Sequence, residues 1–231
     1  MKKVISIFLV IIGIVLLVMP TTNKMIIKHN IDSKVKELDT ITYEDIEKNT
    51  EIEAEFDYSS IEDISVTSTI FESINFDKKS IIGQITIPDL DLNLPILKGV
   101  NNANLSIGAV TMAQGQKMGE GNYSLAGHKM KDKTLLFGSL MDIQLGSIVY
   151  ITDKKTVYEY KIYDTVIVAD TAFDMLDNNK AEERGKPIIS LMTCYYSSNT
   201  GKRFFALGEL IDEYPFEEKM ENDYVHDLII D

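Results

Sequence analysis

The sequence predicts a mainly β domain, either a barrel or a sandwich, preceded by an N-terminal transmembrane helix. From about residue 75 the chain consists of many short β-rich runs separated by turn residues, a pattern typical of these folds. At its start, the stretch from Val4 to Met19 is apolar apart from Ser6 and Gly13. The chain therefore combines a globular part with a part suited to a membrane.

Composition limits the classes of function that the chain can have. Its 231 residues, 45% of them hydrophobic, leave room for one sizeable domain with a buried core. The net charge of -13 argues against a nucleic acid partner, because binding a phosphate backbone needs a basic surface. A single cysteine excludes an intramolecular disulfide, so this thiol is either a buried apolar group or a reactive one.

The N-terminal apolar run has two interpretations, a cleaved signal peptide or an uncleaved signal-anchor. As a helix it spans about 24 Å, and residues 20–22 extend it toward the roughly 30 Å of a hydrocarbon core. The run ends without the small residues of a cleavage site, which favours the anchor. Lys2 and Lys3 then place the N-terminus in the cytoplasm. We expect a single-pass protein of the cell membrane, anchored by residues 1–22, with everything after them outside the cell.

Residues 23–74 are expected to form an extracellular stalk and linker. Apolar residues recur at helical spacing between residues 24 and 47. Residues 44–63 are strongly acidic, which is typical of a solvated linker. The folded domain is then expected at 75–212, followed by an acidic tail at 213–231.

The expected strands follow one another through this domain. The first run ends at Pro88, and Leu90, Leu92 and Leu94 then alternate with polar residues. Further strands are expected at 147–152, 158–163, 165–169, 187–193 and 203–211. Segments 101–107 and 134–142 are expected to be helical or irregular.

The single cysteine, Cys194, ends one of these strands. Alternation places Ser190, Met192 and Cys194 on one face, and a nucleophile at a strand end is both rigidly held and open to substrate. Of the three histidines, only His128 lies inside the β domain. If Cys194 is a nucleophile that needs a histidine, His128 is the first choice. The alternatives are an inert buried cysteine and an exposed histidine in a turn.

Arginine is rare in this chain, which contains Arg184 and Arg203 only. Arg203 begins the last apolar strand, in alternation with Phe205 and Leu207. It is either a charge at a strand edge or a fixed guanidinium that donates hydrogen bonds to a peptide carbonyl or an oxyanion. Arg184 lies in a charged loop and is expected to be solvated.

Sequence motifs for other chemistries are missing. The chain has no G-x-x-x-x-G-K-[ST] loop, H-E-x-x-H helix, C-x-x-C pair, G-x-S-x-G elbow or EF-hand spacing. No metal site and no cofactor are therefore expected.

Three blocks of the sequence resemble those of the sortases, in the same order. They are Leu125–His128, Ser190–Cys194, and Arg203 with Gly208 after it. Shorter matches occur at 85–88, 94–99 and 118–124, so the resemblance extends over about residues 75–212. The N-terminal anchor, without a C-terminal hydrophobic segment, is similar to class A, the housekeeping enzymes of Gram-positive bacteria. Ser190 stands where the family more often has threonine.

The resemblance implies an eight-stranded β-barrel and a transpeptidation reaction. Cys194 would attack an LPXTG-type sorting signal between its threonine and glycine, giving a thioacyl-enzyme. His128 would act as acid and base, and Arg203 would steady the substrate and the oxyanion. The surface protein would then be joined to an amine of lipid II or peptidoglycan. The groove for the signal would be lined by Ala126, Ser190, Met192 and Thr193, and the loop from Ala169 to Pro187 would shape the choice of motif.

Two other functions fit parts of the sequence. A cysteine endopeptidase would use Cys194 and His128 but would only hydrolyse its substrate. A membrane-tethered binding module would have a structural cysteine, and Cys194→Ala would preserve its function.

Overall fold

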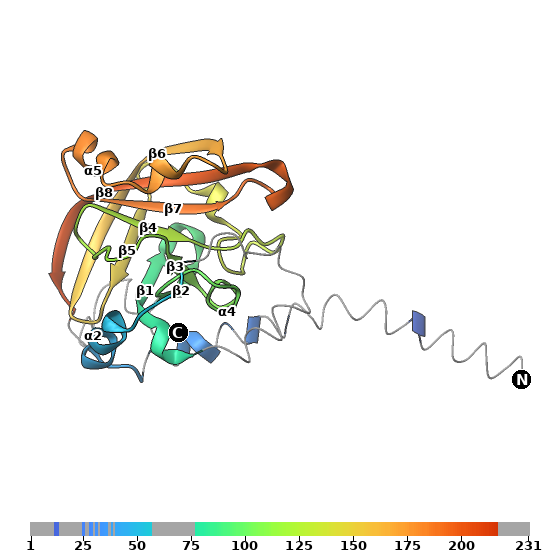
Figure 1. Ribbon diagram of the computed structural model, residues 1–231. Helices are drawn as coiled ribbons and strands as arrows, with labels where there is room; N and C mark the ends of the chain where they lie inside the picture. The colour runs from blue at the N-terminus through green and yellow to red at the C-terminus, as the bar shows by residue number, and fades with distance from the viewer. Residues whose placement is uncertain are drawn as a thin grey trace, which may run out of the picture.

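The computed structural model describes residues 40–56 and 77–216, together with a few separate positions between residues 12 and 38. Within residues 77–216, eight strands close into one barrel in the order β1-β2-β3-β4-β7-β8-β6-β5 (Figure 1). The strands are β1 (Ile81–Ile87), β2 (Leu92–Leu97), β3 (Ala109–Thr111), β4 (Asn122–Ala126), β5 (Ile148–Thr152), β6 (Thr156–Ala169), β7 (Ile188–Cys194) and β8 (Lys202–Pro215). The predicted mainly β, eight-stranded barrel is confirmed.

Short helices connect the strands. Helix α2 (Tyr43–Glu51) precedes the barrel, and α4 (Asn102–Leu105) and α5 (Asn179–Arg184) lie between its strands. Single 3-10 turns occur as η1 (Lys78–Ser80), η2 (Pro88–Leu90), η3 (Leu140–Asp142), η4 (Phe173–Leu176) and η5 (Ser198–Thr200). No helix among the described residues is long and apolar enough to cross a membrane. The expected span at residues 4–19 and the tail beyond residue 216 lie largely or wholly outside the described residues.

The barrel encloses an apolar core because alternate side chains of its strands point inward. Buried side chains from opposite sides of the barrel meet there, among them Ile85, Ile96, Leu125, Leu191 and Ala206. Removing a large apolar side chain of this kind from water contributes about 1.5–3 kcal/mol. The strands are paired antiparallel except for β2 with β3 and β4 with β7. The parallel pair β4–β7 is central to the candidate site.

Two strands differ from the expectation. The segments predicted at 158–163 and 165–169 form the single strand β6, which pairs with β8 and carries a register shift between Ile162 and Asp164. A bulge of this kind interrupts the alternation of inward and outward residues, so one strand has the pattern of two. The short strand β3 was not predicted, because three residues are too few for a periodic pattern.

The acidic segment expected to be a solvated linker is folded over residues 42–56. Thr42 and Asp45 form a capping box at the start of α2, and Ile46 is 1% exposed. Asn49 donates a hydrogen bond to the carbonyl of Ile81 in β1 at 2.8 Å. Phe56 forms a bridge with Val100. The linker interpretation was wrong here, because a narrow apolar stripe anchors an otherwise acidic helix to the barrel (Figure 1).

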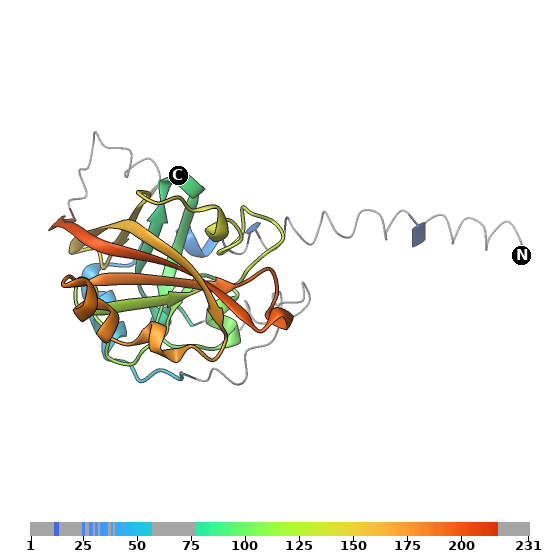
Figure 2. The ribbon, with the colours of Figure 1, turned by 90° about the horizontal axis from the view of Figure 1, so that it is seen from above.

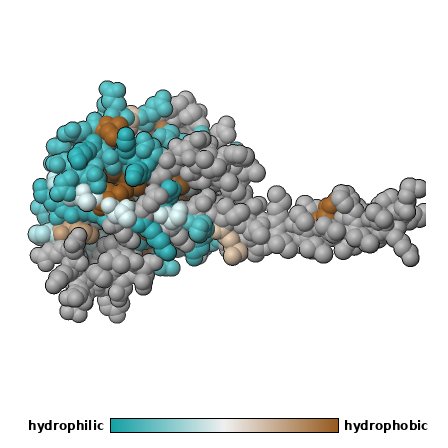
Figure 3. Space-filling view, turned by 90° about the horizontal axis from the view of Figure 1, so that it is seen from below, coloured by the Kyte–Doolittle hydropathy of each residue, from teal (hydrophilic) through white to brown (hydrophobic). Residues whose placement is uncertain are grey.

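The described residues on the face seen from below are mostly hydrophilic (Figure 3). Figure 3 shows apolar residues on this face as separate spots between polar ones. Scattered apolar side chains of this kind are normal on a solvent-exposed surface.

Candidate active site

The candidate site lies where β4 and β7 end beside the start of β8 (Figure 2). Ala126 pairs with Met192 across β4 and β7, and Cys194 pairs with Arg203 across β7 and β8. Two residues beyond the first pair, the parallel register leads to His128 and Cys194. The three chemically active residues predicted from the sequence are therefore brought to one end of three neighbouring strands.

All three side chains belong to the outer face of the barrel. On β4, Leu125 points into the core, which leaves Ala126 and, by alternation, His128 on the outer face. On β7, Leu191 is in the core, whereas Met192 packs against two outer apolar clusters. One of these clusters includes Leu105 and Ala126, and the other consists of Met175, Phe205 and Leu207. On β8, the inner residues are Phe204 and Ala206, so Arg203 lies outside with Phe205. The predicted alternation is confirmed for Leu191 and Met192 on β7 and for Phe204 and Phe205 on β8.

A groove with a volume of about 340 Å³ lies on this outer face. Its chemically active end contains His128, Cys194 and Arg203. Its apolar part and walls are formed by Leu105, Met112, Ala126, Gly127, Ala169, Asp170, Thr171, Ala172, Phe173, Leu176, Met192, Thr193, Ser198 and Phe205. The groove thus brings a thiol, an imidazole and a guanidinium together at one end of an apolar channel.

The backbone leading to His128 is held tightly. The Gly127 amide donates to the carbonyl of Met192 at 3.0 Å, and the Thr193 hydroxyl donates to the carbonyl of Gly127 at 2.8 Å. A Cβ at position 127 would lie 2.6 Å from the ring of Phe137, which is fully buried. Glycine is therefore required by packing, and the close approach of Phe137 fixes the strand just before His128.

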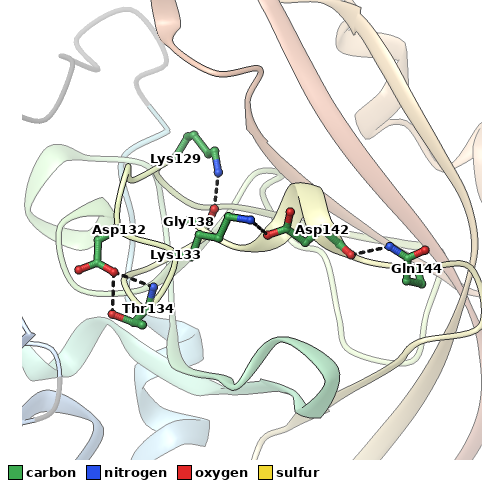
Figure 4. A network of polar contacts seen from close by, with 7 residues as sticks. All are labelled: Lys129, Asp132, Lys133, Thr134, Gly138, Asp142 and Gln144. Carbon is green, nitrogen blue, oxygen red and sulfur yellow. Dashed lines mark hydrogen bonds and ion pairs between the residues drawn. The ribbon is translucent and has the colours of Figure 1, made fainter.

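The loop after His128 is braced by its own polar contacts (Figure 4). The Lys129 ammonium donates to the carbonyl of Gly138, and Lys133 pairs with Asp142 at 2.7 Å. Partial burial lowers the pKa of Lys129. The Phe137 amide donates to the carbonyl of His128 at 3.2 Å. These contacts close the loop onto itself and hold His128 from its C-terminal side.

Cys194 and Arg203 are both accessible from the groove. Cys194 forms no disulfide and is partly buried. Arg203 is partly exposed, and one of its terminal nitrogens donates to the carbonyl of Lys202 at 3.2 Å. Among the described residues, no group of three or more His, Cys, Asp or Glu side chains could hold a metal ion.

The residues predicted to line the groove fall into two groups. Ala126, Met192 and Thr193 do line it, although the Thr193 side chain is 1% exposed. Ser190 does not line it: the side chain is fully buried, and its hydroxyl donates to Asn122 at 2.7 Å. Ser190 shares the face of Met192 and Cys194, as alternation requires, but lies too far back along β7 to reach the groove.

Sequence reasoning missed several wall residues. Leu105 and Met112 come from the segment between β2 and β4, and Phe173 and Leu176 come from η4. Nothing in their local patterns distinguishes them from ordinary apolar core residues. The loop from Ala169 to Pro187 was expected to influence substrate choice, and its first half does form one wall of the groove.

The fold and the groove are those of a cysteine enzyme built on a β-barrel. Residues 85–211 match the sortase domain. Sortase A of Listeria monocytogenes is 39% identical over 224 residues, which cover 97% of this chain and 98% of that protein. The chain therefore belongs to the sortase family, whose members are cysteine transpeptidases.

Solved structures agree with this assignment. The crystal structure of Listeria monocytogenes sortase A is 40% identical, with a TM-score of 0.58 over 64% of this chain and 98% of that one. Sortase C-3 of Streptococcus pneumoniae also has a TM-score of 0.58, over 81% of this chain and 92% of its own, at 19% identity. The latter shares the fold alone.

Proposed function

We propose that this transpeptidase cleaves an LPXTG-type sorting signal between threonine and glycine and joins the surface protein to an amine of lipid II. The observation that carries the proposal is the pairing of Cys194 with Arg203 across β7 and β8, with His128 in the same groove. A nucleophile, a proton carrier and a fixed cation in one groove are the groups that acyl transfer needs.

In the first half-reaction, the Cys194 thiolate attacks the threonine carbonyl carbon. The negative charge that develops on the carbonyl oxygen is stabilised by the Arg203 guanidinium. The bond between carbon and nitrogen then breaks, and His128 gives its proton to the departing glycine amine. The product is a thioester between Cys194 and the threonine.

In the second half-reaction, an amine attacks the thioester. His128 takes the proton that the amine loses, the carbon–sulfur bond breaks, and Cys194 leaves as a thiolate. A thioester remains reactive toward amines, so the cleaved peptide bond is exchanged for a new amide bond. A water molecule in place of the amine would give hydrolysis, which is the endopeptidase alternative.

The groove fits the chemistry of the signal. An extended chain advances about 3.3–3.6 Å per residue, so the leucine of the signal lies about 10 Å from the threonine carbonyl. The apolar part of the groove, which includes Leu105, Met112 and Leu176, then receives the leucine and proline. Ala126 and Met192, which are paired across β4 and β7 beside Cys194, contact the middle of the peptide.

The N-terminal apolar run at residues 4–19 anchors the enzyme to the outside of the cell membrane in this proposal. The basic pair Lys2 and Lys3 supports a cytoplasmic N-terminus. An anchored enzyme and a lipid-borne amine share one membrane face, which raises their effective concentration.

A single assay tests the proposal. The full-length protein in detergent is mixed with an LPXTG peptide, alone or with lipid II, a glycine-based amine or diaminopimelate, and the products are identified by mass spectrometry. We expect a ligated product with wild type and none with Cys194→Ala. Cleavage without ligation to any of these amines would establish the endopeptidase. Lack of reaction, together with a Cys194 that a thiol reagent does not label, would leave a binding module.

A further inference from the structure

One wall of the groove is an irregular segment rather than a strand. Residues 169–176 supply Ala169, Asp170, Thr171, Ala172, Phe173 and Leu176 to the groove, and the longest regular element among them is the short η4 turn. The first part of this wall is tied to the barrel, because the Asp170 amide donates to the carbonyl of Gly201 at 3.0 Å. The second part, which carries Leu176, is held by different contacts.

The second part is held by the packing of Met175 against Phe205 and Leu207 and by hydrogen bonds from a buried side chain, that of Asn122 at the start of β4. Its Nδ2 donates to the carbonyl of Met175 at 3.0 Å and to the carbonyl of Asp177 at 3.1 Å. These two carbonyls lie immediately before and after Leu176. One amide group therefore fixes the backbone on both sides of a residue that lines the groove.

The Asn122 side chain is itself oriented. Its Oδ1 accepts a hydrogen bond from the Ser190 hydroxyl at 2.7 Å, which leaves Nδ2 directed at the loop. Asn122 is 2% exposed and Ser190 is fully buried, so water cannot replace these partners readily. The backbone amide of Asn122 also donates a hydrogen bond to the side-chain oxygen of Asn178 at 2.9 Å. The loop and β4 are thus joined through both the side chain and the backbone of Asn122.

Asn122 acts at a distance from the substrate. It lies four residues before Ala126, which corresponds to about 13 Å along a strand, and it is not among the residues that line the groove. Leu176 packs between the two outer apolar clusters, beside Met192. The Asn122 side chain is therefore connected to the groove wall through the backbone that carries Leu176.

We propose that Asn122, oriented by Ser190, is a positioning residue that holds Leu176 in the groove wall and thereby sets the preference for a large apolar first residue in the sorting signal. This inference rests on the proposed function, because it assumes that the signal's leucine occupies the apolar part of the groove. It assigns Ser190 a role two steps removed from substrate, in place of the direct contact that the family resemblance implied.

The test compares a peptide that begins with leucine with one that begins with alanine, using full-length wild type, Asn122→Ala and Ser190→Ala. For Asn122→Ala we expect the ratio of the two kcat/KM values to fall by about tenfold, mainly through a higher KM for the leucine peptide. For Ser190→Ala we expect about threefold. Ser190→Thr keeps a hydroxyl and is expected to lose less selectivity than Ser190→Ala.

A purely structural role would give a different result. A general loss of folded protein lowers kcat/KM for both peptides equally and leaves their ratio unchanged, and that outcome would overturn the proposal. The rate at which a small reagent alkylates Cys194 is expected to stay near the wild-type value, since the ends of β7 and β8 are held by their own pairing. Asn179→Ala, the neighbouring exposed residue outside this network, is the matched control.

Two further measurements separate the possible failures. If wild type does not process the leucine peptide, the proposed function fails. Hydrogen exchange still tests whether Asn122 holds the backbone around Leu176. The amides of residues 173–178 must exchange faster in Asn122→Ala than in Asn179→Ala. If Asn122→Ala does not fold, Asn178→Ala removes one surface contact of the same network and must lower the selectivity ratio. Unchanged exchange, or an unchanged ratio in both Ser190→Ala and Asn178→Ala, would refute the inference.

Discussion

The two sides of the groove are held in place by different kinds of bonds. The reactive end, with Cys194 and Arg203, is built from paired strands whose register is fixed residue by residue. The opposite wall, with Phe173 and Leu176, is an irregular segment held in part by the Asn122 side chain. One side depends on backbone pairing, whereas the other depends on a few side chains.

This difference predicts that the position of Cys194 and Arg203 tolerates substitution, whereas the position of the groove wall does not. A strand register cannot shift by one residue without turning every side chain to the other face, so Cys194 and Arg203 remain opposite each other under most substitutions. A wall held by side-chain hydrogen bonds can be moved by a single substitution. Changes at the reactive end should therefore affect kcat, and changes at the wall should affect selectivity.

The largest effect is expected from Arg203→Lys. Lysine keeps the charge but loses the planar fork of donors, so an oxyanion would be less well stabilised. We expect kcat to fall about 100-fold, with the melting temperature changed by less than about 3 °C. Steady-state transpeptidation and thermal unfolding check this.

Arg184→Lys is the matched control for this prediction, because Arg184 is the other arginine of the chain and lies on the surface beside Glu209. Its kcat is expected to remain within about twofold of wild type. Equal losses in the two variants would mean that Arg203 has no special role at the reactive end.

Gly127→Ala tests whether packing holds His128. The added Cβ would meet the ring of Phe137 at 2.6 Å, and a buried ring cannot move away freely. We expect a loss of about 1–3 kcal/mol in the free energy of unfolding, together with a lower kcat. Denaturant unfolding and the transpeptidation assay measure the two effects.

A second substitution distinguishes packing from other causes. In the double variant Gly127→Ala with Phe137→Leu, the smaller side chain relieves the contact and part of the lost kcat should return. If the double variant is simply less stable and no more active than Gly127→Ala, the close contact with Phe137 is not what positions His128.

Much of the reactive end could be predicted from the sequence because it depends on strand periodicity. Alternation placed Met192 with Cys194 and Arg203 with Phe205, and the structure confirms both faces. The placement of Ser190 was not predictable in the same way. Alternation gives the face of a residue but not its depth along the groove, which depends on the loop that covers it.

The folded segment at 42–56 was missed for a related reason. Its composition is acidic, and the helix is anchored by few apolar residues, of which Ile46 is the most deeply buried in α2. The composition of such a helix is dominated by its many solvent-facing acidic residues, so it does not reveal the few apolar residues that pack on the barrel. The same limit applies to the groove wall, where Asn122 is an isolated polar residue whose loop partners lie more than fifty residues away along the chain.

Tyr160→Phe tests the barrel framework away from the groove. The Tyr160 hydroxyl accepts a hydrogen bond from the Gly119 amide at 3.0 Å, and the ring is fully buried, which raises the pKa of its phenol. Loss of the hydroxyl leaves that amide without this acceptor, so we expect unfolding to become easier by about 1–2 kcal/mol, with kcat/KM unchanged. The exposed Tyr196→Phe is the control for thermal unfolding. A drop in selectivity would mean that the framework and the wall are not independent.

The smallest effect is expected from Glu209→Gln on β8. Glu209 accepts a hydrogen bond from Arg184 Nε at 2.6 Å and pairs with Lys186 at 3.5 Å, and the hydrogen bond with Arg184 is the main reason that its pKa is lowered. A lowered pKa adds stability above the unfolded-state value of about 4.3 and loses it as the pH falls through the folded-state value. Because the pair is near the surface, we expect a loss of only about 0.2–1 kcal/mol at pH 7, and less in high salt. Denaturant unfolding of both proteins at pH 7 and at pH 3 should show the difference shrinking at pH 3. A difference that persists at low pH would show that Glu209 contributes to the β7–β8 pairing by packing rather than by charge.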